Sequence, residues 1–398
     1  MLAVLGMGIL VLVALSAIKT MSQQSAILAS LATAFLVFGI FLVYSSLKNI
    51  VRIFVRALMP EPQEHLADIV YQSRKRDFLS RGPRVVAIGG GTGLSVLLQG
   101  LKTYTNNIAA VVTVTDTGGS SGRLRDELDV PPPGDMRNCL VALADAEPLI
   151  RDLFQYRFED GTGLKGHSFG NLFITALSKV TGDFERAIRE SSKVLAIRGR
   201  VLPSSLDKVS LVGEFEDGTV AEGETLITSR RKSIRQLSLK PLDCKATAEV
   251  LEAIENAELV VIGPGSLYTS ILPNLLIRDI FDRLMDSDAH KIFVINAMTQ
   301  LGETESMSAF DHLRVLVAHT NPKIVDSSLI NDQTIPAEVL MRYSGTHSIP
   351  VLPDVERFSE HGFRVIAGSH LRIDTQVRHD PVKLAKAIMD EYASILKQ

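Results

Sequence analysis

A glycine cluster at the end of a short apolar run constrains this chain more than any other feature. Residues 85–88 are apolar, residues 89–93 read Gly-Gly-Gly-Thr-Gly, and a helical pattern follows from Leu94 to Leu101. A strand, a tight turn and a helix start in this order present backbone N–H groups to an anion, and glycine allows a ligand to approach closely. The third glycine of a dinucleotide fingerprint is replaced by Leu94, and no Gly-Lys-Ser/Thr of a phosphate-binding loop follows. The sequence therefore predicts an anion-binding loop of neither standard type.

Two uncharged apolar stretches precede this loop. The first begins at Leu2 and ends at Ile18, and the second begins at Ala26 and ends at Leu47. Their lengths approach or match that of a bilayer-spanning helix. A signal peptide is the alternative for the first stretch, but no basic segment precedes it. We therefore expect a transmembrane hairpin over residues 1–48 and a basic juxtamembrane linker over residues 49–83.

The distribution of basic residues predicts the orientation of this hairpin. Lysines and arginines recur between Lys48 and Arg84, whereas the polar turn between the two stretches has only Lys19. Loops on the cytoplasmic side of a membrane are enriched in such residues. We expect a two-pass protein of the plasma membrane whose large C-terminal domain, residues 84–398, is cytoplasmic.

Strand-like and helix-like segments alternate after Arg84, which predicts an α/β fold. Apolar runs at residues 85–88, 108–115, 259–262 and 291–295 are expected to be strands of a Rossmann-like parallel sheet with flanking helices. Residues 200–242, with an Asp-Gly turn at residues 217–218, are expected to form a small β-rich insertion. Glycine-rich loops after the first two strands are expected to border a ligand crevice at the carboxyl ends of the strands.

Composition excludes several classes of function. A net charge of −3 and the absence of tryptophan argue against nucleic-acid binding and against an aromatic binding platform. Two cysteines, Cys139 and Cys244, supply neither a disulfide framework nor the spacing of a metal site. His167 and Ser168 are adjacent in the chain, and a pair this close in sequence is not a catalytic triad, so serine hydrolase chemistry is not expected.

The candidate ligand-binding residues lie in polar, glycine-rich segments that follow strands or begin helices. They are Gly90, Gly91, Thr92, Gly93, Asp116, Gly119, Ser120, Ser121, Arg125, Asp135, Asn138, His167, Ser168, Asn171, Gly263, Gly265, Ser266, Tyr268, Asn296, Thr299 and Gln300.

Several of these residues have more than one interpretation. Asp116 is placed to bind a ribose, to hold Mg²⁺ near phosphates, or simply to form a turn. Arg125 either neutralises a diphosphate or is a solvated helix charge. His167 either contacts a phosphate or sugar or partners a helix cap, and Ser168 is the candidate cap of the helix that follows. Tyr268 either stacks on a base or hydrogen-bonds a ribose, or packs in the core.

Six motifs in order resemble those of the gluconeogenesis factor family (YvcK-type) within the CofD-like, or 2-phospho-L-lactate transferase, superfamily. They are Gly89-Gly90-Gly91-Thr92-Gly93-Leu94, Asp116-Thr117-Gly118-Gly119-Ser120-Ser121-Gly122, Pro132-Pro133-Gly134-Asp135 with Arg137-Asn138, His167-Ser168-Phe169-Gly170-Asn171, Gly263-Pro264-Gly265-Ser266-Leu267-Tyr268-Thr269-Ser270 and Met298-Thr299-Gln300. The resemblance extends from Arg84 to the C-terminus, and the apolar N-terminal stretches are an addition to the family's core.

The resemblance implies a regulatory protein that binds UDP-N-acetylglucosamine or a related UDP-sugar and links carbon metabolism to cell-wall synthesis and cell shape. It implies Tyr268 as a UDP-sugar contact, no required cofactor, a homo-oligomer and a protein partner in cell-wall synthesis. The alternative is a Mg²⁺-dependent transferase that moves a phospho-lactyl-type group from a nucleotide donor. A single acid, Asp116, where the transferases have a more acidic loop, weakens that alternative.

Overall fold

The computed structural model describes residues 23–58, 74, 77–343, 345 and 347–397. Contacts divide the chain into two units, Met1–Arg74 and Lys75–Gln398. In the first unit, α2 is a helix of 36 residues, Gln23–Leu58, that continues past the apolar stretch into the basic segment. Within this description, no helix is long and apolar enough to cross a membrane. The predicted first span, residues 2–18, lies outside the described residues.

The second unit is built around a seven-stranded parallel sheet with the order β10-β9-β8-β7-β1-β2-β3. The strands are β1 Val85–Gly89, β2 Ile108–Val112, β3 Arg200–Pro203, β7 Leu259–Ile262, β8 His290–Val294, β9 Ser327–Asn331 and β10 Arg364–Gly368. The predicted α/β architecture with a parallel sheet is confirmed. The second strand ends at Val112, three residues before the predicted end.

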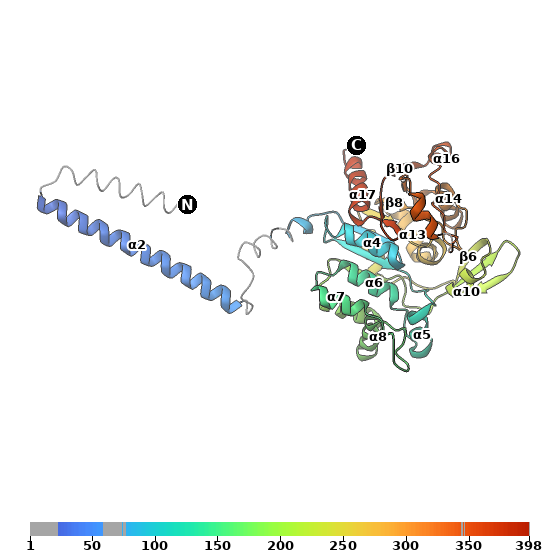
Figure 1. The fold of residues 1–398 in the computed structure, drawn as a ribbon, viewed down its shortest axis with the longest axis horizontal. Helices are drawn as coiled ribbons and strands as arrows, with labels where there is room; N and C mark the ends of the chain where they lie inside the picture. The colour runs from blue at the N-terminus through green and yellow to red at the C-terminus, as the bar shows by residue number, and fades with distance from the viewer. Residues whose placement is uncertain (1–22, 59–73, 75–76, 344, 346, 398) are drawn as a thin grey trace. The chain divides into compact units, whose positions relative to one another are not determined.

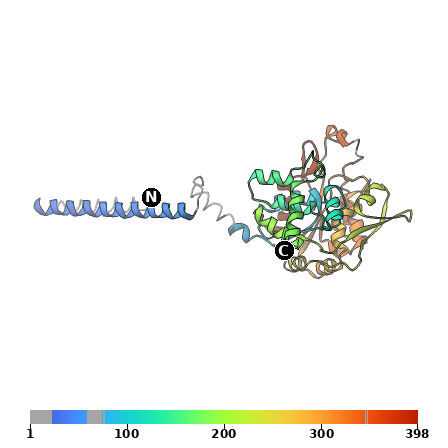
Figure 2. The same ribbon diagram turned by 90° about the horizontal axis from the view of Figure 1, so that it is seen from below.

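Helices cover both faces of this sheet (Figures 1 and 2). Their bounds are α4 Gly91–Leu101, α5 Gly119–Leu128, α6 Gly134–Leu143, α7 Pro148–Gln155, α8 Phe169–Thr181, α9 Phe184–Val194, α10 Glu224–Ser229, α11 Ala248–Glu255, α12 Leu272–Leu275, α13 Arg278–Asp286, α14 Ala309–His319, α15 Ala337–Leu340, α16 Val355–Glu360 and α17 Pro381–Ile395. Successive side chains of β1 point to opposite faces of the sheet, and each face has its own hydrophobic core. Val85 and Ala87 pack with α4, α6 and α17, whereas Val86 and Ile88 pack with α11, α13 and α14.

The predicted β-rich insertion is smaller than expected. Its sheet contains β4 Ser210–Phe215, β5 Val220–Glu222 and β6 Ile234–Lys240, all antiparallel, and the Asp-Gly turn joins β4 to β5 as predicted. Residues 200–203 were expected in the insertion but form β3, the edge strand of the main sheet, because they pair with β2. The yellow-green sheet projects from the rest of this unit in both views (Figures 1 and 2).

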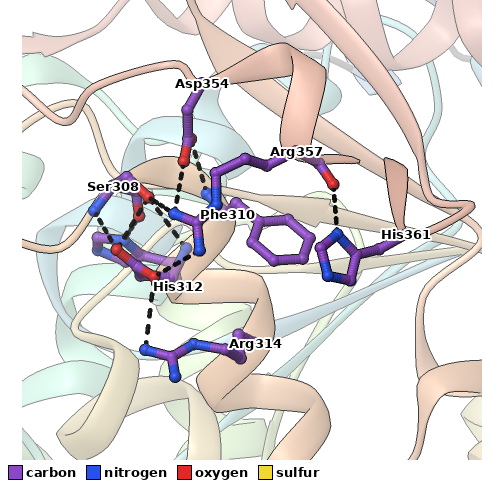
Figure 3. A network of polar contacts seen from close by, with 8 residues as sticks. Ser308, Phe310, His312, Arg314, Asp354, Arg357 and His361 are labelled. Carbon is purple, nitrogen blue, oxygen red and sulfur yellow. Dashed lines mark hydrogen bonds and ion pairs between the residues drawn. The ribbon is translucent and has the colours of Figure 1, made fainter. Parts of the chain in front are cut away.

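A polar network joins α14 to α16 (Figure 3). Ser308 caps α14 by accepting a hydrogen bond from the backbone of Asp311, and Asp311 accepts in return from the Ser308 N–H. Arg357 of α16 pairs with Asp354 at 3.0 Å and with Asp311 at 3.3 Å, and its guanidinium lies 4.7 Å from the ring centre of Phe310. A capping box and a cation–π contact stabilise the helix start and its neighbour. The role of this network is therefore structural.

Candidate functional site

β1 and β7 are parallel neighbours at the centre of the sheet, and the strands that follow each of them in sequence are added on opposite sides. β1 is followed by β2 and β3 on one side, and β7 by β8, β9 and β10 on the other. In open α/β sheets, ligands bind beyond the carboxyl ends of the strands where the strand order reverses in this way. The loops that follow Gly89 and Ile262 are therefore the expected position of a ligand.

The loop after β1 runs directly into α4. Gly90 precedes the helix in an extended conformation without a side-chain cap, and Gly91, the first helical residue, has a φ of +63°. A Cβ at Gly93 would lie 2.5 Å from the carbonyl oxygen of Pro264, so the contact between the two loops requires glycine there. This loop thus presents main chain rather than bulky side chains beyond β1.

The loop after β7 is held in place from the end of β8. The Asn296 side chain donates through Nδ2 to the Gly265 carbonyl at 2.8 Å and accepts through Oδ1 from the Gly265 N–H at 3.2 Å. Gln300 donates through Nε2 to the Ser266 hydroxyl at 2.8 Å. Asn296 and Gln300 therefore position the loop as well as bordering the space in front of it.

A cavity of about 350 Å³ lies between these loops and a C-terminal hairpin, β11 Leu371–Ile373 and β12 Val377–His379. Its volume falls in the range of small-molecule sites. The predicted residues that line it are Gly90, Gly91, Thr92, Gly93, Gly265, Ser266, Asn296, Thr299 and Gln300. The residues that sequence reasoning missed are Val96, Pro264, Ser270, Ala297, Met298, Tyr343, Ser348, Gln376, Val377, Arg378 and His379.

The cavity lining carries a positive charge and no negative one. The lining contains no aspartate, glutamate or lysine, and Arg378 supplies its fixed charge. Burial and the neighbouring His370 lower the pKa of His379 to about 4, so that its imidazole is neutral near pH 7. A cavity with a cation, a helix start and no carboxylate favours an anionic ligand.

Most of the remaining predicted residues lie in a second polar region, around the start of α5, that does not line the cavity. Ser120 and Ser121 lie in the first turn of α5, because this helix already begins at Gly119 rather than after the glycine-rich segment as predicted. The Ser120 hydroxyl is 3.0 Å from Nδ1 of His167 and accepts from Nδ2 of Asn171 at 3.1 Å. Ser168 caps α8, as the sequence predicts.

Arginine side chains extend this cluster. Arg137 donates to the Ser168 hydroxyl and, at 2.8 Å, to Oδ1 of Asn138. Arg125 is buried and donates to the Val209 carbonyl at 2.7 Å, which ties α5 to the start of β4. The structure therefore gives Arg125 a structural contact and places it outside the cavity lining.

Asp135 lies between the loop after β1, which lines the cavity, and Asp116 of the second glycine-rich segment. Its carboxylate hydrogen-bonds to the backbone of Gly91, and a Cβ at Gly90 would lie 2.5 Å from its Oδ2. Burial, followed by the charge on Asp116, raises the pKa of Asp135 to about 6. Asp116 itself accepts a hydrogen bond from the Gly118 N–H at 2.7 Å, as in a turn.

Two further carboxyl groups, both half-buried, lie near this point. Burial raises the pKa of Glu224 to about 8 and that of Glu303 to about 7, and Glu303 accepts from the Thr269 hydroxyl at 3.1 Å. Nowhere in the described part of the chain do three Asp, Glu, His or Cys side chains converge so as to hold a metal ion. The Mg²⁺ role of Asp116 stays a prediction.

The structure does not bring Tyr268 or Gly263 to the cavity. Tyr268 is 1% exposed, and its ring packs edge-on to His319 in the core cluster around α14. Burial raises the pKa of its hydroxyl to about 12. Gly263, with a φ of +80°, donates to the Ile88 carbonyl at 2.8 Å and so continues the pairing of β1 with β7. A ligand contact by Tyr268 stays a prediction.

A second cavity, of about 410 Å³, lies at the opposite edge of the sheet, where Val85, Ile108 and Arg200 begin their strands. Ligands of open parallel sheets bind at the carboxyl edge, not at this one. The cavity next to Gly90 is therefore the candidate site despite its slightly smaller volume.

Comparisons with known proteins agree with this fold. The family model described as 2-phospho-L-lactate transferase CofD matches residues 85–371. A protein from Halalkalibacterium halodurans named gluconeogenesis factor is 49% identical over 77% of this chain and 95% of its own length. The gluconeogenesis factor of Bacillus subtilis is 45% identical over 78% of this chain and 99% of its own length.

A solved structure resembles the second unit closely. An X-ray crystal structure of a protein from Bacillus halodurans is 48% identical and has a TM-score of 0.76, and the match covers 78% of this chain and all of that chain, 100%. This relative folds without a counterpart of the remaining part of the present chain. The unit Lys75–Gln398 is thus suited to experiments on its own.

Proposed function

The chain belongs to the family of 2-phospho-L-lactate transferase CofD, and from this premise we propose that it is a regulatory protein of the gluconeogenesis factor type that binds a UDP-sugar. UDP-N-acetylglucosamine is the ligand we favour, and its binding links carbon metabolism to cell-wall synthesis and cell shape. The observation that carries the proposal is the carboxylate-free cavity between the start of α4 and the loop after β7. Main-chain N–H groups at a helix start suit a diphosphate.

Different parts of the site suit different parts of the ligand. The main chain of residues 90–93 borders the phosphates, and the polar side chains of Asn296, Thr299 and Gln300 offer donors and acceptors for the sugar or the base. The proposal includes no required cofactor. Regulation then follows from a change in how the ligand-bound unit contacts a protein of cell-wall synthesis or a second copy of itself.

Calorimetry with the unit Lys75–Gln398 tests the ligand. We expect heat on titration with UDP-N-acetylglucosamine and none with GDP or NAD, because only the UDP-sugar is proposed to fit. Ligand at 100 times its Kd stabilises a folded protein by about 2.7 kcal/mol, so a thermal shift accompanies binding. The absence of both heat and thermal shift with every UDP-sugar would contradict the proposal.

We also propose that α2 attaches the protein to the plasma membrane, with the C-terminal unit on the cytoplasmic side. The support is the exposure of large apolar side chains along this helix, including Phe35, Phe38 and Phe41. Water disfavours such a surface, and lipid favours it. Cell fractionation of the full chain and of a chain starting at Lys75 tests this: recovery of both in the supernatant would contradict it.

A Mg²⁺-dependent transferase is the second candidate, favoured by the name of the matching family model. In this case Mg²⁺ would neutralise phosphate charge close to Asp116, whose charge already raises the pKa of Asp135. The test is nucleotide release from a nucleotide-linked phospho-acid, with and without Mg²⁺, in the wild type and in Asp116→Asn. Turnover that depends on Mg²⁺ and is lost in the variant supports this candidate; unchanged turnover in the variant removes the role of Asp116.

A further inference from the structure

The cavity at the edge of the sheet where β1, β2 and β3 begin, called the amino edge below, has no part in the proposed function. Its volume is about 410 Å³, and its lining contains two arginines, Arg84 and Arg200, three asparagines and no aspartate or glutamate. Soluble ligands of open parallel sheets bind at the opposite edge. A basic cavity on this side therefore favours an anionic partner of another kind.

Arg84 is held at this cavity by contacts with the start of β7. Its Nε donates to the Asn256 carbonyl at 2.5 Å, and its backbone N–H donates to the carboxylate of Glu258 at 2.9 Å. The guanidinium lies 3.6 Å from the same carboxylate, while the Arg84 side chain is still 60% exposed. An ion pair as exposed as this one is weak, so the guanidinium remains able to bind an anion from outside.

Arg200 has no acidic partner. It is the first residue of β3, and its side chain is exposed. A Cβ at Gly199 would clash with the carbonyl oxygen of Ile108, so glycine allows the chain to approach β2 closely just before Arg200. Asp145 pairs with Arg198 at 2.6 Å, and within the described part of the chain no ion pair includes Arg200. Its guanidinium is therefore available to a phosphate, two of whose oxygens it can bind at once.

The segment by which the chain enters this unit packs beside the cavity. Asn107, a lining residue, donates through Nδ2 to the carbonyls of Ser80 and Gly82, both at 2.8 Å. Within this segment Leu79 is buried, whereas Phe78 is 74% exposed. A large apolar ring next to basic residues is typical of a surface that rests in the headgroup region of a bilayer.

The connection to α2 also brings lipid within reach of this edge. Residues 74–84 contain five basic residues and one acid, Asp77. Residues 59–76 join α2 to this segment, and a chain of that length spans at most roughly 60 Å. A protein attached to lipid through α2 is therefore tethered to it by the amino edge of its second unit.

We propose that the amino edge is a membrane-contact surface, whose cavity binds the phosphate of an anionic phospholipid headgroup between Arg84 and Arg200. Phe78 enters the headgroup region beside it. This inference rests on the proposed attachment through α2 and deepens it, because it gives the second unit a lipid contact of its own. The contact turns the opposite edge of the sheet, with the cavity next to Gly90, towards the solution from which a soluble ligand arrives.

Vesicle sedimentation of the unit Lys75–Gln398, which lacks α2, tests this surface. We expect the unit to sediment with vesicles of phosphatidylcholine and phosphatidylglycerol in equal parts, and to stay in solution with phosphatidylcholine alone. Arg84→Gln and Arg200→Gln should each weaken binding about fivefold, because one basic residue near an anionic surface contributes about 1 kcal/mol. Phe78→Ser should weaken it too, and high salt should reduce the difference between Arg200→Gln and the wild type. Because the Arg200 side chain has no acidic partner, its variant keeps the test clear if Arg84→Gln unfolds.

Arg372→Gln is the matched control, because it removes an exposed, ion-paired arginine from the hairpin of β11 and β12, beside the other cavity. Its vesicle binding should equal that of the wild type. Equal thermal unfolding of Arg372→Gln and Arg200→Gln shows that both variants are folded. An equal loss of vesicle binding in these two variants would overturn the inference, since it would reflect the net charge of the unit rather than this surface.

The outcomes separate this inference from the proposals made above. If the unit binds neither kind of vesicle, the inference fails, while UDP-sugar binding and attachment through α2 are unaffected. If the unit binds anionic vesicles but the full chain is recovered in the supernatant of fractionated cells, the surface stands and attachment through α2 fails. If calorimetry shows binding of inorganic phosphate that is lost in Arg200→Gln, while vesicles leave the unit in solution, the cavity is a site for free phosphate and the lipid assignment is overturned.

Discussion

Asn296 offers the sharpest test of how the cavity is built. Its side chain makes two hydrogen bonds to the main chain of Gly265, at 2.8 and 3.2 Å, and a third to Gln300 at 3.3 Å. Asn296→Ala removes all three. A hydrogen bond contributes about 1 kcal/mol net, and water reaches this partly buried position, so we expect a loss of roughly 2 kcal/mol in the free energy of unfolding.

The same substitution should weaken ligand binding. Without Asn296 the loop after β7 keeps its hydrogen bond from Gln300 but loses both bonds to Gly265, so ordering the loop becomes a cost of binding. We expect the affinity for UDP-N-acetylglucosamine to fall about tenfold, which corresponds to about 1.4 kcal/mol. A loss of 2 kcal/mol in stability lowers the Tm of a unit of this size by roughly 3 °C.

Asn107→Ala is the control for this experiment. Asn107 donates to two main-chain carbonyls, those of Ser80 and Gly82, both at 2.8 Å, at the opposite edge of the sheet. Denaturant unfolding should show a comparable loss of stability for both variants, while calorimetry should show a loss of affinity only for Asn296→Ala. Equal affinities of the two variants, or an unchanged stability of Asn296→Ala, would refute this account of the loop.

Three further predictions concern the same region. Gly93→Ala should lower stability by about 1–3 kcal/mol and weaken binding, because its Cβ would lie 2.5 Å from the Pro264 carbonyl oxygen. Gly265→Ala should leave stability unchanged, because the atom nearest to its Cβ is 3.4 Å away. Chemical denaturation and calorimetry check this. Tyr268→Phe should leave the affinity unchanged if the ring serves the core, and a clear loss of affinity would instead assign the hydroxyl to the ligand. The pKa of Glu224 is raised to about 8 in the folded state, so stability from this group is present below its unfolded pKa and falls as the pH rises towards 8. Glu224→Gln should therefore match the wild type near pH 4.5 and exceed its unfolding free energy at pH 9, and parallel pH profiles would contradict this.

The sequence was sufficient to predict the centre of the sheet and the first wall of the cavity. The runs that became β1 and β7 are apolar at every position because helices cover both of their faces, which makes them easy to recognise. The glycine cluster at residues 89–93 is recognisable because the loop after β7 packs so closely against it that Gly93 has no room for a side chain. Ser168 was recognisable as a cap because its hydroxyl is followed by a helical pattern.

The rest of the site is formed by contacts between segments far apart in sequence, which local sequence patterns do not predict. β3 was missed because it has only four residues, begins with an arginine and ends with a proline. β11 and β12 have three residues each, too few for a period of two to stand out, although Arg378 and His379 come from this hairpin. The cavity next to Gly90 is lined by the loop after β7 and not by the second glycine-rich segment, for a similar reason. The neighbour of β1 on the cavity side is β7, which lies far along the chain.

Because β1 pairs with a strand far along the chain, part of the sheet can form only late in synthesis. The Arg84 N–H bonds to the carboxylate of Glu258, 174 residues later, where β1 and β7 begin side by side. At a synthesis rate of about 5–20 residues per second, β1 waits roughly 10 to 35 s for its partner, long after α2 has emerged. During this interval the apolar edge of β1 is open and the cavity does not exist. Ligand therefore cannot assist the early steps of folding, and β2 does not cover that edge, because it pairs with the other side of β1.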